Sequence, residues 1–227
     1  MDSSGIIYLV RHCATANDEA NYPILLGQRH DLGLSDAGRE QGEALAEYMS
    51  SKNVDSIYAS PQARAVQTAR IINESVEGSV TFCTSLKEVD MGRWEGKTYE
   101  AIMADDADNF DAYLRDPGTY GYPGGENLSQ VCQRALNFIE RLAEMHPDQR
   151  IVVITHKYVN RTVLAHLMAL PLHRAREIDQ DPGCVNVIRV FRGEMELQTV
   201  NYTSNFELAE EEEEQCKSPS TAHSVLE

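Results

Sequence analysis

Residues 6–16 read IIYLVRHCATA, an apolar run that ends in an arginine, a histidine and a cysteine. The uninterrupted run over 6–10 predicts a strand that is buried on both faces of a sheet. The polar side chains that follow then lie at the carboxyl end of that strand, where ligands bind in sheets of parallel strands. The segment therefore predicts a reactive site at a strand end, and it leaves open whether His12 or Cys13 reacts.

Strand and helix patterns alternate along the rest of the chain. Ser35 is expected to cap a helix that runs to about Lys52, and Ser60 and Pro61 predict the N-cap and first residue of the next helix. The run IVVIT has no polar alternation, which is typical of a central strand. The pattern predicts an α/β fold, a three-layer α/β/α arrangement with a mostly parallel central sheet. The strands are expected at 6–10, 54–59, 80–83, 151–155, 185–191 and 195–200, and the main helices at 35–52, 62–75, 127–146 and 158–169.

The length of 227 residues fits one well-buried domain, which we expect to span residues 1–206. Within it, residues 99–125 are polar, irregular and dotted with aromatic residues, which is typical of a lid over a substrate site. We expect these aromatic side chains to pack on the core rather than on a substrate. The last segment, 207–227, holds seven Glu and one Lys without apolar periodicity, which predicts a disordered acidic tail.

Composition and charge narrow the class of partner. The net charge is −16, which argues against nucleic acid and anionic membranes as partners. No apolar run approaches the roughly 20 residues of a membrane helix, and no secretory leader is apparent, so a cytoplasmic location is expected. The five cysteines are scattered without metal-like spacing, which predicts reduced thiols and no metal site.

The cysteine and histidine hypotheses can be compared by spacing. A cysteine phosphatase loop needs an arginine after five intervening residues, and Glu19 stands there instead of it. The carboxylate would repel a phosphate, which excludes Cys13 as the nucleophile. The surrounding residues favour His12 as the nucleophile, because Arg64, Glu88 and His156 also follow predicted strands. Together they predict phosphoryl transfer, in which an imidazole attacks, guanidinium groups bind phosphate oxygens and a carboxylic acid protonates the leaving group.

Six segments extend this prediction to most of the chain, from about residue 6 to 192. With them the chain resembles the histidine phosphatase superfamily, the phosphoglycerate mutase-like group. That resemblance implies the phosphoglycerate mutase-like fold, a phosphohistidine intermediate and no metal or organic cofactor. The segments are LVRHCAT (9–15), GLSDAGREQG (33–42), SPQARAVQTA (60–69), LKEVDMGRWEG (86–96), PGGENL (123–128) and VVITHKYV (152–159).

The resemblance also assigns site residues. It implies His12 as the nucleophile, Glu88 as the general acid, and a phosphate pocket around them. The residues expected to bind substrate or phosphate are Arg11, Thr15, Asn17, Gln28, Arg64, His156 and Lys157.

Three positions depart from the family pattern. Cys13 stands where a glycine usually follows the Arg-His pair, and Asp18 stands where a pocket asparagine is usual, with Asn17 one residue earlier. A one-residue slip in the loop would bring Asn17 into the pocket. Lys157 replaces the glycine that usually follows the second histidine, so that it either points to solvent or adds a cation to the pocket.

These features predict a metal-independent phosphomonoester hydrolase whose partners are a small phosphorylated metabolite and inorganic phosphate. A cofactor-dependent phosphoglycerate-type mutase is the first alternative, and the sequences GYPGGENL and DMGRWEG resemble the phosphatase branch instead. A non-catalytic phospho-ligand binding or scaffold protein is the second, and such proteins usually lack one of the site residues that this chain retains. The identity of the substrate and the oligomeric state remain open at this stage.

Overall fold

The computed structural model describes residues 4–203, so the predicted acidic tail at 207–227 lies outside the described residues. The described chain contains a six-stranded sheet in the order β3-β2-β4-β1-β5-β6. One strand, β5, runs in the opposite direction to the other five strands of the sheet. This confirms the mostly parallel sheet. The strands are β1 (Gly5–Arg11), β2 (Ser56–Ala59), β3 (Ser79–Phe82), β4 (Arg150–Thr155), β5 (Val185–Phe191) and β6 (Glu194–Tyr202).

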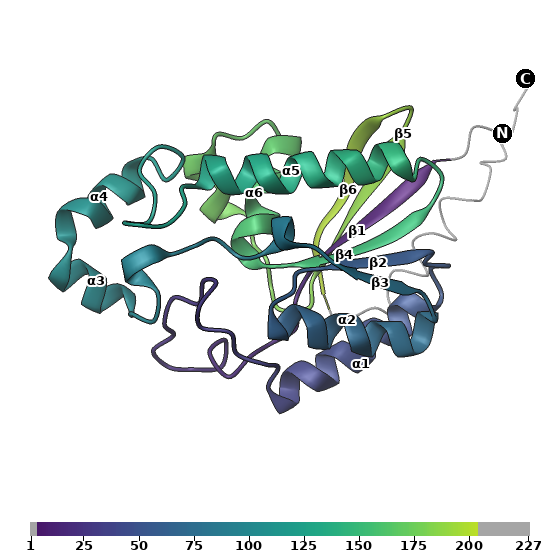
Figure 1. Cartoon of the computed structure of the whole chain (residues 1–227), viewed down its shortest axis with the longest axis horizontal. Helices are drawn as coiled ribbons and strands as arrows, with labels where there is room; N and C mark the ends of the chain where they lie inside the picture. The colour runs from purple at the N-terminus through teal and green to yellow at the C-terminus, as the bar shows by residue number, and fades with distance from the viewer. Residues whose placement is uncertain (1–3, 204–227) are drawn as a thin grey trace, which may run out of the picture.

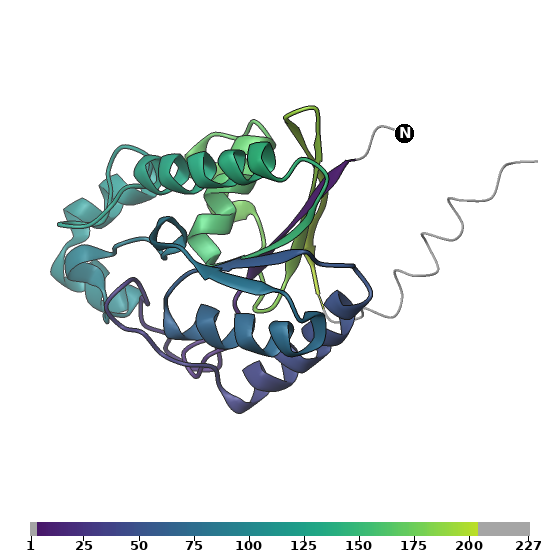
Figure 2. The same ribbon diagram turned by 45° about the vertical axis from the view of Figure 1, so that its right-hand side comes forward.

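Helices cover both faces of this sheet, and the two ribbon views show the resulting three layers (Figures 1 and 2). The first two helices lie on one face, and the longest helix and α6 lie on the other. The α-helices are α1 (Asp36–Ser50), α2 (Ala63–Val76), α3 (Tyr99–Asp105), α4 (Ala107–Arg115), α5 (Leu128–Met145) and α6 (Lys157–Leu167), with short 3₁₀ turns η1 (Thr84–Leu86), η2 (Gly92–Trp94) and η3 (Leu172–Glu177).

The side chains of β1 explain why its sequence is apolar without alternation. Ile7 and Leu9 belong to the core cluster that includes residues of α5 and α6. Tyr8 and Val10 point the other way, into the cluster formed with α1 and α2. A strand covered on both faces has no solvent-facing side, so every position along it favours an apolar residue.

The start of α2 differs from the prediction. Ser35 caps α1 as expected, with its hydroxyl accepting a hydrogen bond from the Gly38 amide. The N-cap of α2 is Gln62, not Ser60, and the first helical amide, that of Ala63, donates to the carboxylate of Asp31 at 2.8 and 2.9 Å. The prediction for Ser60 and Pro61 was wrong because a loop 32 residues earlier supplies the acceptor that local capping would otherwise provide.

The segment predicted to act as a lid contains α3 and α4, which lie beyond the carboxyl ends of the parallel strands (Figure 1). Three of its aromatic residues, Phe110, Tyr113 and Tyr122, are buried, and their rings contact Trp94 edge-on at 5.7–5.8 Å between centroids. This confirms the expected core packing for these three, whereas Tyr120 remains 53% exposed. The aromatic cluster fixes the segment to the rest of the domain.

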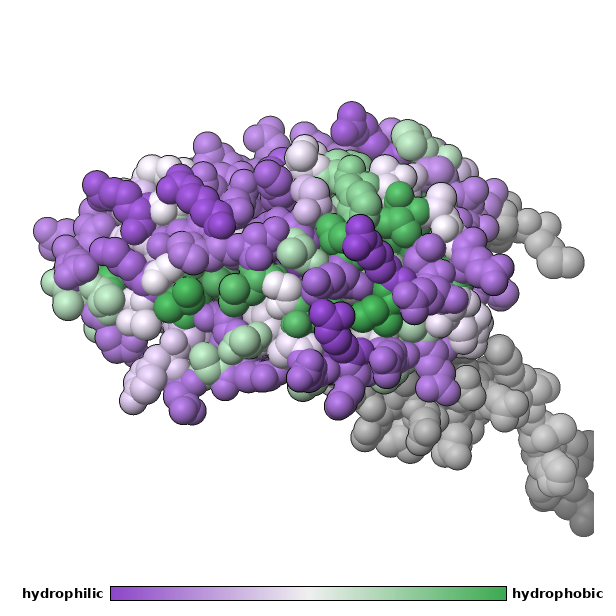
Figure 3. Space-filling model, turned by 60° about the horizontal axis from the view of Figure 1, so that its bottom comes forward, coloured by the Kyte–Doolittle hydropathy of each residue, from purple (hydrophilic) through white to green (hydrophobic). Residues whose placement is uncertain are grey.

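The surface on the side of α1 and α2 is mainly hydrophilic, with apolar residues in small groups (Figure 3). Among residues 4–203, no helix combines the length and the apolar character that crossing a bilayer requires.

Candidate active site

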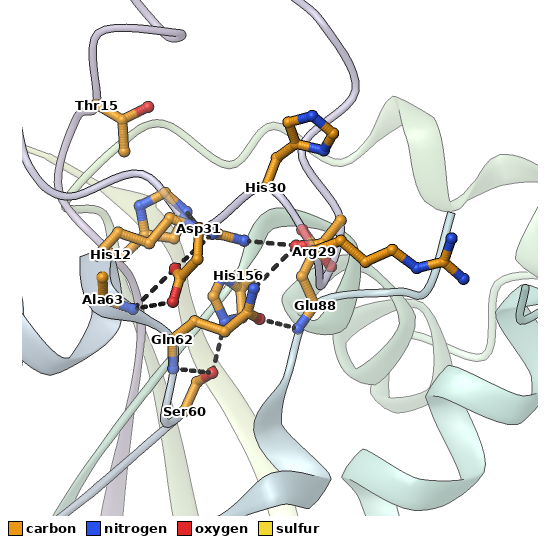
Figure 4. A network of polar contacts seen from close by, with 12 residues as sticks. His12, Thr15, Arg29, His30, Asp31, Ser60, Gln62, Ala63, Glu88 and His156 are labelled. Atoms are coloured by element: carbon orange, nitrogen blue, oxygen red, sulfur yellow. Dashed lines mark hydrogen bonds and ion pairs between the residues drawn. The ribbon is translucent and has the colours of Figure 1, made fainter. Parts of the chain in front are cut away.

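The parallel register brings three chain segments to one edge of the sheet. Arg11, the last residue of β1, pairs with Thr155 of β4, and the His12 amide donates to the Thr155 carbonyl at 2.9 Å. The Ser60 amide, just after β2, donates to the Ile154 carbonyl at 2.9 Å. The residues that follow β1, β2 and β4 therefore meet at neighbouring strand ends, as Figure 4 shows for His12, Ser60 and His156.

These strand ends open into a cavity of about 250 Å³, which we call the strand-end cavity. One side is polar and one is apolar, the latter formed by residues 23–26, Met91, Tyr99 and Tyr158. The polar side contains Arg11, His12, Asn17, Asp18, Arg64, Glu88 and Lys157. The cavity thus combines charged groups with a wall suited to a small organic group.

The contacts of His12 determine its protonation state. Its Nδ1 lies 2.8 Å from the Cys13 carbonyl oxygen, which only accepts hydrogen bonds, so Nδ1 carries the proton. Its Nε2 accepts a hydrogen bond from Arg64 Nε at 3.2 Å, so this nitrogen carries the lone pair. Burial lowers the pKa of His12 well below its usual value, and the charges of Arg64 and Arg11 lower it further. The imidazole is therefore neutral, with its nucleophilic nitrogen at a cavity lined by cations.

Arg64 is held from three sides. Besides His12, its guanidinium donates to the Gly27 carbonyl at 3.2 Å and to the Asp31 carboxylate at 3.3 Å. The side chain is almost completely buried. Its position depends on α2 and on the loop that also caps this helix, which links the helix start to the geometry of the cavity.

Arg11 is paired with a carboxylate inside the cavity. One terminal nitrogen donates to the Gln180 carbonyl at 2.7 Å, and the other forms an ion pair with Asp18. The Asp18 carboxylate also accepts hydrogen bonds from the amide and the hydroxyl of Thr15. Arg11 lowers the pKa of Asp18 against the opposing effect of burial. Asp18 is therefore an anion that shares Arg11 with whatever binds in the cavity.

Asn17 also lines the cavity, next to Asp18. Its side-chain amide donates to the Ile24 carbonyl at 3.0 Å, and its oxygen accepts from the Ile24 amide at 2.9 Å. Both polar atoms of Asn17 hold the apolar wall of the cavity in place.

Glu88 lies on the segment after η1, and it is buried at the cavity wall. Burial raises its pKa above the usual value, while hydrogen bonds from the amides of Val89 (2.9 Å) and Tyr158 (3.3 Å) partly oppose this shift. A buried carboxyl with a raised pKa is suited to hold a proton and to donate it.

His156 lies behind His12 rather than on the cavity wall. It is fully buried at the N-cap of α6, its ring centroid is 5.2 Å from that of His12, and its Nε2 lies 2.8 Å from the Ser60 hydroxyl. Its Nδ1 is buried and has no hydrogen-bond partner within residues 4–203. Burial, followed by the charge of Arg64, lowers its pKa well below the usual value.

The remaining candidate residues divide into two groups. Lys157 lines the cavity, which is the second of the two positions that the sequence left open for it, and burial lowers its pKa. Thr15 and Gln28 are not part of the cavity wall. Thr15 binds Asp18, and it stands apart from His12 and Glu88 in Figure 4. Gln28 donates to the Glu88 carbonyl at 2.8 Å, so it positions that segment.

The thiol of Cys13 is buried beside the cavity and is not part of its wall. Burial raises the pKa of this thiol to about 12, whereas a reactive cysteine has a lowered pKa. Its environment agrees with the exclusion of Cys13 on spacing.

Sequence reasoning missed two residues that hold Glu88. Gln62 bridges two segments, accepting from the Glu88 amide at 2.8 Å and donating to the Gly27 carbonyl at 2.9 Å (Figure 4). Arg134 of α5 donates to the Glu88 carbonyl at 3.0 Å and pairs with Glu126 at 2.8 Å. Gln62 lies within SPQARAVQTA, and Glu126 lies within PGGENL, so the motifs contained a signal, but they do not state which partner each residue holds.

The arrangement suits transfer of a charged group to His12. A neutral imidazole nitrogen, two arginines, one lysine and a carboxyl with a raised pKa surround one small cavity. In the part of the chain that the structure describes, no three His, Cys, Asp or Glu side chains are grouped as metal ligands.

Comparison with known proteins gives one family. The sequence model described as "Histidine phosphatase superfamily (branch 1)" matches residues 7–203. The chain is 30% identical over 185 residues to phosphoserine phosphatase 1 of Hydrogenobacter thermophilus, covering 81% of this chain and 86% of that one. It is 28% identical over 195 residues to the adenosylcobalamin/alpha-ribazole phosphatase of Escherichia coli, covering 86% and 95%. The solved structure of Bacillus stearothermophilus YhfR superposes with a TM-score of 0.81 at 27% identity, covering 89% and 99%.

Proposed function

This chain belongs to the histidine phosphatase superfamily (branch 1), and we propose that it hydrolyses small phosphomonoesters through a phosphohistidine formed on His12, without a metal ion. The proposal rests on one observation above all: the hydrogen bonds of His12 leave it neutral, with the Nε2 lone pair on the side of Arg64. A neutral imidazole nitrogen is a nucleophile, and its lone pair becomes free to attack when Arg64 turns from it to the phosphate oxygens.

In the first step, His12 Nε2 attacks the phosphorus atom, and an N–P bond forms as the ester P–O bond breaks. Glu88 gives its proton to the departing alkoxide, which leaves as a neutral alcohol. The proton stays on Nδ1 and remains hydrogen-bonded to the Cys13 carbonyl, and this hydrogen bond stabilises the positive charge that the phosphorylated ring acquires. Arg64, Arg11 and Lys157 stabilise the negative charge on the transferring phosphoryl oxygens.

In the second step, Glu88 is a carboxylate and takes a proton from water as the water oxygen attacks phosphorus. The N–P bond breaks, inorganic phosphate leaves, and His12 returns to its neutral form with Glu88 protonated. His156 does not touch the transferring group in this scheme. It supports the ring of His12 and is itself held by Ser60.

The cavity favours a small monoester as the substrate. A volume of about 250 Å³ is enough for a phosphate group and a short organic group, and the apolar wall of residues 23–26 and Met91 faces the latter. Asp18 cancels part of the positive charge, which disfavours substrates with several phosphates. The similar proteins of H. thermophilus and E. coli are named phosphoserine phosphatase and adenosylcobalamin/alpha-ribazole phosphatase, which supports a small phosphorylated metabolite as the substrate.

We propose the cytoplasm as the location on the state of the cysteines. Cys13, Cys83, Cys132 and Cys184 all carry free thiols, which is typical of a reducing compartment.

The test is a rapid-quench experiment with ³²P-labelled phenyl phosphate in EDTA. We expect an acid-labile, base-stable phosphoryl group on His12, and loss of at least about 10⁴-fold in kcat for His12→Ala. Cys13→Ser is the matched control and should retain the intermediate. Turnover that persists in His12→Ala, or a labelled residue other than His12, would overturn the mechanism. An intermediate that passes its phosphoryl group to an added phosphoglycerate instead of water would identify a mutase.

A further inference from the structure

A second cavity, of about 330 Å³, lies next to the strand-end cavity. Its walls come from α3, α4, the start of α5, α6 and η3, with Pro117 between α4 and α5, so we call it the helical cavity. The residues proposed for phosphoryl transfer do not line it. Its volume lies within the range of sites that bind small molecules.

The floor of the helical cavity is apolar. Phe110 and Tyr113 of α4, Leu128 of α5 and Ala175 of η3 line it, and all four are buried. The Tyr113 hydroxyl is already hydrogen-bonded to that of Tyr122 at 2.8 Å. The floor therefore offers a surface for a ring or a branched aliphatic group, with little demand for hydrogen bonds from the ligand.

The charged residues in the rest of the lining are two arginines, although the chain has a net charge of −16. Arg161, His173 and Arg176 line the cavity, and no Asp or Glu does. Arg161 and Arg176 donate to main-chain carbonyls, those of Ile178 (2.8 Å) and Leu114 (3.4 Å).

Within residues 4–203, neither arginine forms an ion pair with a carboxylate. The acidic neighbour of Arg176, Glu177, is already paired with Arg174 at 2.8 Å. Two guanidinium groups thus retain donors that face a cavity without a counter-charge.

We propose that the helical cavity is a binding site for a small apolar anion, an aryl or branched aliphatic carboxylate. The apolar part rests on the buried floor, and the carboxylate binds Arg161 and Arg176. The site itself does not depend on the function proposed above.

The two cavities share a wall. Tyr99 and Tyr158 line both cavities, and their hydroxyl groups are hydrogen-bonded at 3.0 Å. The Tyr158 amide also contacts the Glu88 carboxyl at 3.3 Å. The apolar anion is therefore either a separate molecule, sensed by Glu88 through Tyr158, or the far end of a long substrate that passes between the two tyrosines.

Binding is tested by ¹⁹F NMR with 4-fluorobenzoate, and with 4-fluorobenzyl alcohol as the uncharged counterpart. Saturating inorganic phosphate is added to occupy the strand-end cavity. We expect 4-fluorobenzoate to bind in the presence of phosphate and the alcohol to bind at least about tenfold more weakly. Displacement by phosphate, or equal binding of the alcohol, would overturn the proposal.

Two exposed arginines provide matched variants, Arg176 in the cavity wall and Arg141 of α5 outside it. Arg176→Glu reverses a charge on the cavity wall and should weaken binding of 4-fluorobenzoate at least about tenfold. Arg141→Glu makes the same change on an exposed position of α5, outside the wall, and should change binding less than about twofold. Equal effects of the two variants would show that only long-range charge matters, and would overturn the site.

Kinetic measurements distinguish whether the anion is a separate molecule or part of the substrate. Of the experiments in this subsection, only this one rests on the proposed function. Phenyl phosphate is compared with the same ester carrying a para-carboxyethyl chain. If the cavity holds the far end of the substrate, the carboxylate lowers KM and Arg176→Glu removes this advantage. If KM is the same for both esters, the ligand is a separate molecule. An enzyme that binds 4-fluorobenzoate but hydrolyses neither ester would contradict the proposed function and leave the site intact.

Discussion

The two cavities have similar volumes but are built in opposite ways. The strand-end cavity takes its polar groups, apart from Glu88, from residues that follow β1, β2 and β4, whose register is fixed by main-chain hydrogen bonds. The helical cavity depends on side-chain packing between α3, α4, α5, α6 and η3. A sheet register sets positions without reference to particular side chains, whereas a helix contact shifts when its side chains change.

Because of this difference, we expect the strand-end cavity to set the rate of the reaction and the helical cavity to set which ligands bind. The groups proposed for phosphoryl transfer sit on the rigid frame, and the groups that face the rest of a ligand sit on segments whose packing is set by aromatic rings such as Trp94. Substitutions at strand ends should therefore affect the rate of the reaction, and substitutions in the helical wall should affect what binds. Five predictions test this separation, in order of decreasing effect.

The largest effect is expected for Glu88→Gln, which keeps the shape but removes the proton donor. The loss in kcat/KM should be about 10²–10⁴-fold for an alkyl phosphate, whose leaving group needs a proton. It should be much smaller for p-nitrophenyl phosphate, whose leaving group departs as an anion. Steady-state assays with both esters measure the difference, and equal losses would contradict a role in protonation.

The pH dependence of kcat/KM should follow from the protonation of His12 and Glu88. Transfer needs His12 neutral, so kcat/KM falls as pH drops through the pKa of His12, which is lowered below 6.5 by burial. It also needs Glu88 protonated, so kcat/KM falls as pH rises through the pKa of Glu88, which is raised above 4.5 by burial. We expect the basic limb to disappear in Glu88→Gln while the acidic limb remains. A basic limb unchanged in this variant would assign it to the substrate or to another group.

A smaller effect is expected for Arg64→Lys, which keeps the charge. The single ammonium nitrogen of lysine cannot reach the three positions from which the guanidinium nitrogens of Arg64 donate to His12, Gly27 and Asp31, so His12 loses this hydrogen bond. We expect a loss of about 10²-fold in kcat for p-nitrophenyl phosphate. Arg161→Lys in the helical wall is the comparison, and it should change that kcat less than about twofold. Similar losses for both would break the separation between the two regions.

Asp18→Asn should improve binding of phosphate. It removes the anion that shares Arg11, and an amide oxygen can still accept the hydrogen bonds from Thr15. We expect the inhibition constant of inorganic phosphate to fall about tenfold, since removing a partly buried charge of the same sign favours the anion. Glu19→Gln makes the same charge change at an exposed neighbour and should have little effect. Weaker inhibition would mean that Asp18 is needed to position Arg11.

The smallest effect is expected for Tyr99→Phe, which removes the hydrogen bond between the two cavities. The free energy of unfolding should fall by about 1 kcal/mol, measured by denaturant titration. The kcat for p-nitrophenyl phosphate should stay within about twofold, because no group at the phosphorus atom moves. Tyr120→Phe, at a tyrosine that is 53% exposed, is the control for stability. A large drop in kcat would show that the shared wall takes part in the chemistry.

The sequence by itself determined the sheet and the chemical inventory of the site. Apolar runs without alternation predict buried parallel strands, and the polar residues directly after them have to meet at one edge. For that reason His12, Arg64 and Glu88 could be chosen before any coordinates, and Cys13 excluded by the absence of an arginine after its loop. These inferences hold because strands and their ends follow from local patterns.

Only the tertiary structure decided which partners those residues have. Asp31 caps α2 in place of Ser60, Asp18 pairs with Arg11, and Gln28 holds the Glu88 segment instead of facing the cavity. The helical cavity could not be predicted from the sequence either, because its lining residues come from segments up to 77 positions apart, from Tyr99 to Arg176. A hydrogen bond between distant residues depends on angstrom-scale placement, which residue type and spacing do not encode.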